Sequence, residues 1–427
     1  MTARTFTFLH AADLHLDSPL RGLARYPGAP VERLRNATRA AFVNLVEAAL
    51  AHRVAFVIVA GDVFDGDWRD YNSGLWFTSE ARRLVEAGIA LVLLRGNHDA
   101  ESRLTKGLRH GPGVYEFPTD AAVTHTLEGF DVALHGQSFA VPHVTENLVR
   151  AYPAPLPGAF NIGVLHTGLE GYEGHGRYAP CTPLDLQAKG YDYWALGHIH
   201  QRQVVSQDPW IVFPGNLQGR HARELGPKGA TLVRVVEGQV SAVEALECDV
   251  ARWAHIEQDL TGIETEAAAF VALERALSLA LRSADGRLVA ARVTFRGTTL
   301  LDGALRADPR RVEGEVRNLG LSVSAELWVE KVLIETEGVA QVEAQAQRSG
   351  DAFAALAQRL SGAGLDDEEL TALAADLGRL GDRLPPNVAA ALQPKDPAVL
   401  RAAVEPAARY LAALLRHQEA PHGGSSA

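Results

Sequence analysis

The stretch RTFTFLHAADLHLDSP, residues Arg4–Pro19, begins as a run of β-forming residues and ends in acids and histidines. Its apolar half predicts a buried strand. Asp13 and His15 follow that strand with one residue between them, and alternate residues of an extended segment point the same way. Carboxylate and imidazole groups are metal ligands. The stretch therefore predicts a strand that delivers two ligands to a metal site.

Four further segments repeat this arrangement. Strands are predicted over residues 54–59, 89–94, 160–165 and 191–196, and metal-ligating side chains follow each of them within a few residues. The candidate ligands after the five strands are Asp13, His15, Asp62, Asn97, His166, His198 and His200, with Asp65 and His98 beside them. Ligands of α/β proteins bind at the carboxyl ends of strands. The repetition therefore predicts one shared site.

Two divalent ions about 3.5–4 Å apart need a bridging carboxylate, further oxygen or imidazole ligands, and open positions for water and substrate. Asp62, in the motif GDVFD, is the candidate bridge. Glycine precedes Asp62, Asn97 and His198, and we expect it to let the chain turn sharply there. Capping and loop chemistry would explain any one of these residues alone. The complete set favours a two-metal centre.

Predicted strands and helices alternate, which favours an α/β domain. Apolar residues at helical spacing predict helices over 32–52 and 73–88, and the second ends in a glycine suited to a C-cap. Residues 231–248 predict a β-hairpin with glycine at its turn.

Beyond the hairpin the pattern changes. Helices predicted over 264–283 and 308–320 alternate with strands predicted over 288–297 and 327–336. We expect an α/β domain at residues 1–250, a small α/β unit at 251–338, an Ala- and Leu-rich helical region at 339–418 and a disordered tail at 419–427.

The composition excludes several classes of protein. A formal net charge of -11 weighs against bulk, non-specific binding of nucleic acid, although it leaves room for a local basic groove. Cys181 and Cys248 lie far apart and form no CxxC motif, so neither a disulfide scaffold nor a thiolate zinc site is expected. The N-terminus lacks the apolar stretch of a signal peptide, and no segment is long enough to span a bilayer. We therefore expect a cytoplasmic protein without membrane contact.

The order of the motifs, D-x-H, GD, GNHD, H and GHxH, resembles that of the calcineurin-like metallophosphoesterases over roughly the first 230 residues. The resemblance implies an α/β fold in which a β-sandwich flanked by helices forms the catalytic core at 1–250. It also implies a small α/β cap domain at 251–338 and a helical C-terminal segment. The implied activity is metal-dependent hydrolysis of phosphate esters.

The resemblance also assigns roles residue by residue. Asp13, His15, Asp62 and His200 would hold one ion, and Asp62, Asn97, His166 and His198 the other. His98 would be the catalytic histidine, which faces the phosphate and stabilises developing charge or protonates the leaving oxygen. Asp65 matches the carboxylate that orients this histidine in phosphatase members, whereas nuclease members vary there. The donor set suits Mn²⁺, with Fe²⁺ or Zn²⁺ as alternatives.

Within this superfamily, HAADLHLDSP (residues 10–19) and FPGNLQGRHARELGPKG (residues 213–229) resemble the DNA-repair nuclease branch, near SbcD and closest to the YhaO proteins. Asp17, Ser18 and Pro19 fit no coordination role. SbcD-type nucleases work with an SMC-type ATPase that docks through helices after the cap, and YhaO is associated with a similar ATPase, YhaN. The resemblance therefore implies DNA and a YhaN-like ATPase as partners, and leaves a homodimer open.

Three further features have two readings each. Arg220, Arg223 and Lys228 follow the PGN turn, where they could meet the phosphate backbone of DNA, and a solvated loop explains them equally well. Asn216, in the turn itself, is a candidate for substrate binding together with Arg220 and Arg223. The aromatic residues of 64–77 are suited to stacking bases, although helix packing is preferred. His10 points away from Asp13 and is expected to pack or to support the ligands.

The resulting hypothesis is hydrolysis of phosphodiester bonds in DNA by an exonuclease or endonuclease of DNA repair, with a metal-bound hydroxide as nucleophile. One alternative is a small-molecule phosphodiesterase or nucleotide pyrophosphatase of the same fold, against which the cap and helical segment weigh. Another is a mainly structural DNA-end-binding subunit of an ATPase complex, against which the complete ligand set weighs.

Overall fold

The computed structural model describes residues 5–18, 28–65, 71–101, 110–170 and 178–338, together with residues 371 and 375. The chain divides into two compact units. The first consists of residues 1–254 and 281–290, and the second of residues 255–280 and those from 291 onward. The regions predicted at 339–418 and 419–427 lie outside the described residues, apart from positions 371 and 375.

Two six-stranded sheets form the first unit. The first sheet has the order β12 (Gln239–Glu247), β11 (Gly229–Val236), β1 (Phe6–Ala11), β2 (Phe56–Ala60), β3 (Ala90–Leu94) and β4 (Val114–Glu116). The second has the order β5 (Val123–Leu127), β6 (Val132–Gly136), β7 (Phe160–His166), β8 (Tyr193–Gly197), β10 (Trp210–Phe213) and β9 (Gln203–Gln207). The five predicted strands are confirmed as β1, β2, β3, β7 and β8.

These five strands belong to two sheets rather than to one. In the first sheet β1, β2 and β3 are parallel neighbours, with Leu9 opposite Val57 and Val57 opposite Leu91. In the second sheet β7 and β8 are parallel, with Val164 opposite Ala195. The ligand-bearing strand ends therefore come from both layers of a sandwich.

An apolar core joins the two sheets. The ring of Phe8 in β1 stacks on Phe56 of β2 with centroids 4.9 Å apart, and it meets Tyr193 of β8 edge-on at 5.3 Å. Alternate residues of a strand face opposite sides, so Leu9 and Val57 instead join a second core on the far face of the first sheet. The first sheet thus contributes apolar side chains to a core on each of its faces.

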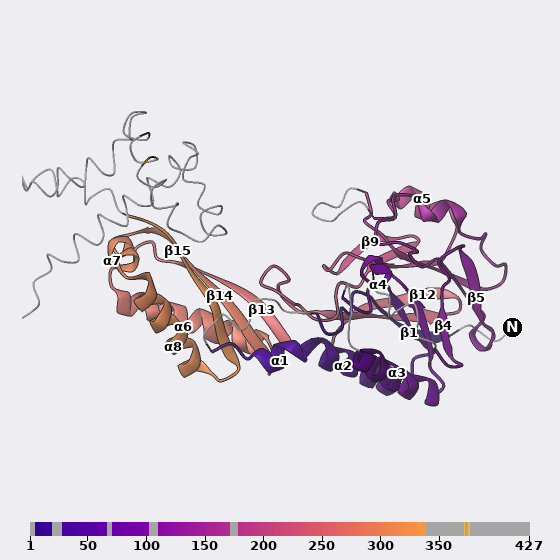
Figure 1. Cartoon of the computed structure of the whole chain (residues 1–427), viewed down its shortest axis with the longest axis horizontal. Helices are drawn as coiled ribbons and strands as arrows, with labels where there is room; N and C mark the ends of the chain where they lie inside the picture. The colour runs from indigo at the N-terminus through magenta and orange to yellow at the C-terminus, as the bar shows by residue number, and fades with distance from the viewer. Residues whose placement is uncertain are drawn as a thin grey trace, which may run out of the picture. The chain divides into compact units, whose positions relative to one another are not determined.

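Helices cover that far face. The helices α2 (Ala37–His52) and α3 (Tyr71–Glu86) lie beside one another against it (Figure 1), and Phe42 stacks on Phe77 with centroids 5.2 Å apart. The single helix predicted over 32–52 is wrong in one respect. A turn at Asn36 divides it into α1 (Val31–Arg35) and α2. The β-sandwich flanked by helices is confirmed.

Two turn predictions are also confirmed. Gly88 ends α3 with a φ of 78°, which suits a glycine C-cap. Glu237 and Gly238 join β11 to β12 with φ of 54° and 76°, the paired positive values of a type I′ hairpin.

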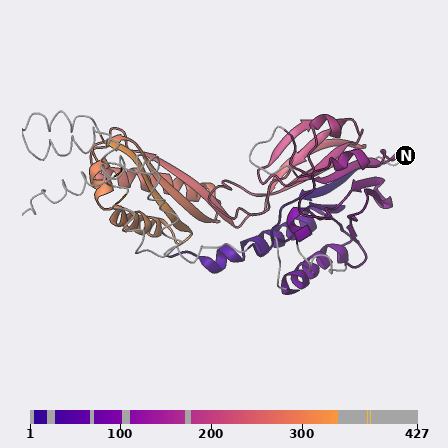
Figure 2. The same ribbon diagram turned by 45° about the horizontal axis from the view of Figure 1, so that its top comes forward.

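The second unit is built on a three-stranded sheet. Its strands are β13 (Ala251–Asp259), β14 (Leu288–Thr299) and β15 (Leu327–Gly338), and its helices are α6 (Glu266–Ser283), α7 (Asp302–Ala307) and α8 (Pro309–Val323). α6 and α8 lie side by side on one face of the sheet (Figures 1 and 2), where Arg311 pairs with Glu266 at 2.9 Å. The predicted helices and strands of this segment are present, and β13 and α7 are additions that the sequence pattern did not predict.

Across the residues that the structure describes, no helix combines the length and the apolar character needed to cross a membrane.

Candidate metal centre

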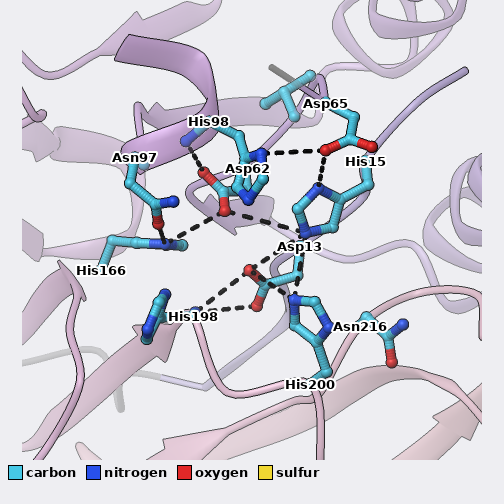
Figure 3. A network of polar contacts seen from close by, with 12 residues as sticks. Asp13, His15, Asp62, Asp65, Asn97, His98, His166, His198, His200 and Asn216 are labelled. Atoms are coloured by element: carbon cyan, nitrogen blue, oxygen red, sulfur yellow. Dashed lines mark hydrogen bonds and ion pairs between the residues drawn. The ribbon is translucent and has the colours of Figure 1, made fainter. Parts of the chain in front are cut away.

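The five strand ends bring the predicted ligands together (Figure 3). The segments after β1 and β2 are hydrogen-bonded: the N–H groups of Asp13 and His15 donate to the carbonyls of Gly61 and Asp62, each at 3.0 Å. The end of β8 is joined to the segment after β7 in the same way: the N–H of Thr167 donates to the carbonyl of Gly197 at 3.1 Å. The residues that converge are Asp13, His15, Asp62, Asn97, His166, His198 and His200, with Asp65 and His98 beside them.

The backbone turns at several of these residues into the left-handed region. The φ angles are 53° at Asp13, 43° at His15, 53° at Asp62 and 97° at His198. Non-glycine residues rarely adopt such values, and each costs on the order of 1–3 kcal/mol. Four strained residues around one centre are typical of a functional site rather than of ordinary loops.

The neighbouring glycines act differently from what the sequence led us to expect. Gly61 has a φ of 100° and does turn the chain. Gly96 and Gly197 have no such φ. Glycine is required at these two positions because a side chain would collide with neighbouring atoms. A Cβ at Gly96 would lie 2.2 Å from Oδ1 of Asp62, and one at Gly197 would lie 1.9 Å from the carbonyl oxygen of Ala60. The sharp-turn explanation is therefore right for Gly61 and wrong for the other two.

Asp62 lies between the candidate ligands from both sheets. Its Oδ1 accepts a hydrogen bond from the backbone N–H of His98 at 2.9 Å. Its Oδ2 lies 3.4 Å from Nε2 of His166 and 3.9 Å from Nε2 of His15. Burial alone would raise the pKa of Asp62, but the charge and hydrogen bond of His166 hold that pKa well below its usual value. An ionised oxygen between two imidazoles is what a bridging ligand requires.

His166 points its Nε2 atom toward this centre. Its Nδ1 lies 3.0 Å from the carbonyl oxygen of Ala60, which can only accept, so Nδ1 carries the proton. Its Nε2 faces Oδ1 of Asn97 at 3.0 Å. Burial would lower the pKa of His166, but Asp62 raises it to about 9. In the metal-free protein Nε2 of His166 therefore carries a proton, at a point between the oxygens of Asp62 and Asn97 where positive charge is favoured and a metal ion could replace that proton.

His200 is held in the same manner from the other side. Its Nδ1 donates to Oε1 of Glu224 at 2.7 Å, so in the neutral ring Nε2 carries the lone pair. That Nε2 lies 3.2 Å from Nε2 of His15 and 3.8 Å from Oδ1 of Asp13. Burial, and then the charge of Arg220, lower the pKa of His15 to about 4, so this ring is neutral near pH 7.

The donor atoms fit a pair of divalent cations. Among the described residues, ligand atoms within 4.8 Å of one another form three overlapping groups. The groups are Asp13 with His15 and His200, His15 with Asp62 and His98, and Asp13 with Asp62 and His166. Carboxylates, imidazoles and an amide oxygen suit Mn²⁺, Fe²⁺ or Zn²⁺. The division of these residues between two particular ions stays a prediction.

His98 stands at the start of α4 (Asn97–Glu101), beside the candidate ligands. Its Nδ1 lies 3.0 Å from Oδ1 of Asp65, and its side chain is 37% exposed. Burial would lower the pKa of His98, but the hydrogen bond to Asp65 and the charge of Asp62 raise it above the usual value. An accessible imidazole whose protonated form is favoured is suited to donate a proton to a leaving group.

Asp65 is itself fixed by three neighbours. Ser18 donates from its hydroxyl to Oδ2 of Asp65 at 2.7 Å, Nδ1 of His15 lies 3.5 Å from Oδ1, and the guanidinium of Arg220 lies 3.6 Å from Oδ2. Ser18 belongs to the LDSP stretch, for which the sequence indicated no role. The structure therefore connects that stretch to His98 through Asp65.

The residue before Ser18 anchors the same loop. Asp17 accepts two hydrogen bonds of 2.6 Å from the guanidinium of Arg39 on α2, and a third from the hydroxyl of Ser73 on α3. The segment that carries His15 is thereby tied to both covering helices. Pro19 lies outside the described residues.

Sequence reasoning missed two buried acids. Asp99 accepts from the N–H groups of Val63, Phe64 and Gly96, and burial together with Asp62 raises its pKa to about 7. The feature of the sequence that could have indicated Asp99 is its position as the last residue of the GNHD motif. Glu224 contacts His200. The sequence indicated it more weakly, only by its position four residues after Arg220 in the loop beyond the PGN turn.

The three residues expected to contact substrate have different surroundings. Asn216 is fully buried, and its amide donates to the carbonyl of Gln218 at 2.8 Å and to Glu224 at 3.0 Å. Arg220 lies between Asp65 and Glu224 with 14% of its side chain exposed, and Arg223 is exposed. Their role in substrate binding stays a prediction.

Two predicted packing roles are confirmed. Phe64 and Phe77 are buried in the core, with ring centroids 5.8 Å apart, whereas residues 66–70 of the same stretch lie outside the described part. His10 is buried between the sheets, where it contacts the hydroxyl of Tyr193 at 3.0 Å and the carbonyl of Leu196 at 3.1 Å. It contributes no atom to the metal-binding groups.

Comparison with known families matches both units. Residues 6–202 match the family described as calcineurin-like phosphoesterase, and residues 253–337 match the middle domain of the metallophosphoesterase YhaO. The first match covers the candidate metal centre up to and including His200.

Known proteins agree with these matches. The chain is 36% identical over 296 residues to the metallophosphoesterase YhaO of Bacillus subtilis, which covers 68% of this chain and 72% of that protein. It is 26% identical over 230 residues to the DNA double-strand break repair protein Mre11 of Sulfurisphaera tokodaii, and 28% identical over 221 residues to that of Saccharolobus solfataricus. These matches cover 49% and 48% of this chain, and the chain spans 57% and 52% of the two Mre11 proteins.

Proposed function

Because the chain belongs to the YhaO family of calcineurin-like metallophosphoesterases, we propose that it is a two-metal phosphodiesterase that acts on DNA. Hydrolysis of phosphate esters belongs to the family, whereas DNA as the substrate and Mn²⁺ as the metal are our proposals. The observation that carries the metal chemistry is the convergence of imidazole and carboxylate lone pairs around Asp62, with His98 beside them.

Each ion has a proposed set of ligands. Asp13, His15, Asp62 and His200 would hold one, and Asp62, Asn97, His166 and His198 the other. When bound, two divalent ions supply positive charge that polarises the phosphate and lowers the pKa of water. Mn²⁺ is the proposed metal, and Fe²⁺ and Zn²⁺ are the alternatives.

The proton transfer falls to His98. Its Nδ1 is held by Asp65, which leaves Nε2 for the substrate. The raised pKa of His98 favours the protonated form of the ring. That proton can pass to the leaving oxygen or stabilise the charge that develops on the phosphate. Asp65 sets the direction of the ring, and Ser18 and Arg220 hold Asp65 in turn.

DNA is favoured over a small diester by the relatives. Two of them are named as DNA double-strand break repair proteins. Arg220 and Arg223 would supply positive charge for a phosphate backbone near the metal centre, with Asn216 behind them, and exonuclease and endonuclease activity are both compatible with this layout. A small-molecule phosphodiesterase or nucleotide pyrophosphatase is the alternative enzyme. A mainly structural DNA-end-binding subunit is the alternative outside enzymes, and the complete donor set weighs against it.

A YhaN-like SMC-type ATPase is the proposed partner. Its proposed docking region, residues 339–418, lies outside the described residues. A homodimer and a cytoplasmic location are compatible with this proposal, and no membrane partner is proposed.

The test compares substrates under one set of conditions. Purified protein is incubated with end-labelled DNA and, separately, with bis(p-nitrophenyl) phosphate, each with Mn²⁺ and with EDTA. We expect Mn²⁺-dependent cleavage of DNA that Asp62→Ala abolishes. Hydrolysis of the small diester without cleavage of DNA would support the small-molecule enzyme. Two bound Mn²⁺ ions without hydrolysis of either substrate would support the structural subunit.

A further inference from the structure

Glu224 is a buried carboxylate whose oxygens meet hydrogen-bond donors only. Oε1 lies 2.7 Å from Nδ1 of His200, 3.5 Å from the guanidinium of Arg220 and 3.5 Å from Nε2 of His221. The same guanidinium lies 3.4 Å from Nδ1 of His200, a longer contact than that from Glu224. Oε2 accepts from the backbone N–H of Arg220 at 2.7 Å and from the amide of Asn216 at 3.0 Å. The side chain is 6% exposed. A buried acid with this many donors is fully satisfied only as a carboxylate.

We infer that Glu224 is a positioning residue that keeps the proton of His200 on Nδ1, so that Nε2 offers its lone pair to the metal centre. This inference rests on the metal centre of the proposed function. Neutral imidazole has one protonated nitrogen, and the acceptor beside it decides which one. With Glu224 at Nδ1, the other nitrogen is left for a cation, beside Asp13 and His15.

An amide at this position cannot do the same. Gln has nearly the shape of Glu but replaces one oxygen with an NH₂ group. If that NH₂ faces His200, the ring must accept at Nδ1 and carry its proton on Nε2, where a metal would bind. If it faces the other way, it meets the N–H of Arg220 and the amide of Asn216, which are both donors. The first orientation therefore blocks the metal-binding nitrogen of His200, and the second breaks the hydrogen bonds of the loop.

The alternative explanation is that Glu224 only stabilises the loop from Asn216 to Glu224 through its hydrogen bonds with Asn216 and Arg220. Both readings predict that a substitution harms the protein, so activity alone does not separate them. A role through His200 has one distinctive consequence. In a protein that already lacks the His200 imidazole, substitution of Glu224 should not weaken metal binding further. If Glu224 acts only by closing the loop, the same substitution should weaken metal binding in that protein as well.

The experiment measures Mn²⁺ binding by isothermal titration calorimetry with the full chain. The proteins are wild type, Glu224→Gln, His200→Ala, the double variant, and the matched control Glu244→Gln, whose residue is exposed on β12. We expect wild type and control to bind two ions. Glu224→Gln should weaken one of them by roughly 10- to 100-fold. In the His200→Ala background the same change should have no further effect.

Two outcomes would overturn the inference. One is wild-type affinity in Glu224→Gln. The other is an equal loss of affinity with and without His200, which would assign Glu224 to the loop alone. If wild type itself binds no Mn²⁺, the metal centre of the proposed function fails and takes this inference with it. Two ions in wild type with either overturning outcome leaves the proposed function intact.

A measurement on wild type covers the case in which Glu224→Gln does not fold. Long-range ¹H–¹⁵N spectra distinguish the two nitrogens of each imidazole, and His200→Gln identifies the signals of this ring. We expect a protonated Nδ1 and an unprotonated Nε2 in the metal-free protein. A ring protonated on Nε2 alone would contradict the inference.

Discussion

Nδ1 of His98 and Oδ1 of Asp65 are 3.0 Å apart, and the backbone N–H of the same histidine donates to Oδ1 of Asp62 at 2.9 Å. The histidine is more than one-third exposed, whereas the Asp62 side chain is nearly buried. The difference in exposure agrees with the proposed roles, in which His98 transfers a proton and Asp62 bridges the ions.

That separation predicts different effects of two substitutions. His98→Ala should still bind two Mn²⁺ ions while the rate of DNA cleavage falls by about 10²- to 10⁴-fold, the usual contribution of a general acid. Asp62→Ala should lose both binding and cleavage. Calorimetry with Mn²⁺ and cleavage of end-labelled DNA make the two measurements. Wild-type turnover in His98→Ala would show that the assignment of His98 is wrong.

Ser18 should act on catalysis without touching the metals. Its hydroxyl donates to Oδ2 of Asp65 at 2.7 Å, and a hydrogen bond to a charged group contributes about 1.5–3 kcal/mol. Ser18→Ala should therefore lower kcat by about 10- to 150-fold, since 1.36 kcal/mol corresponds to one factor of ten. Mn²⁺ affinity should stay within a factor of about three. Ser241→Ala, on exposed β12, is the control and should match wild type.

Gly96 should be required for metal binding rather than for folding. A Cβ there would lie 2.2 Å from Oδ1 of Asp62, so Gly96→Ala must displace the bridging carboxylate. We expect loss of Mn²⁺ binding by at least about tenfold, with a metal-free protein that still unfolds cooperatively. Gly314→Ala is the control, because a Cβ at Gly314 meets nothing within 4 Å. Equal Mn²⁺ affinity in the two variants would refute the explanation.

His10 should make the metal-free protein less stable in acid. Burial lowers the pKa of His10 from 6.5 to about 3 in the folded chain. Below pH 6.5 the unfolded chain therefore takes up a proton at this ring and the folded chain does not, so stability falls as the pH decreases from 6.5 toward 3. Relative to His10→Gln, wild type should lose up to about 1.4 kcal/mol per pH unit in that window.

Urea unfolding at pH 7, 6 and 5 measures this difference. The exposed His52 provides the control, since His52→Gln should follow the pH dependence of wild type. Parallel stability curves for wild type and His10→Gln would show that His10 does not cause the acid sensitivity.

Much of the fold was predictable because its signals are local. Each of the strands β1, β2, β3, β7 and β8 is an apolar run with turn residues after it, and the helices show their own spacing. The break at Asn36 was not predictable in the same way, because the apolar pattern continues on both sides of it. β13 was missed because residues 254–259 are only partly buried, which weakens the apolar signal of a strand.

The sequence by itself determined the candidate ligands, since a strand end followed by acids and imidazoles is a local pattern of residue types. Only the tertiary structure decided how they are held. The strand ends come from two sheets, and the contacts from Ser18 to Asp65 and from Glu224 to His200 join residues 47 and 24 positions apart. Such partners meet only when the chain has folded, because a hydrogen bond depends on distance in space and leaves no mark on the spacing of residues along the chain.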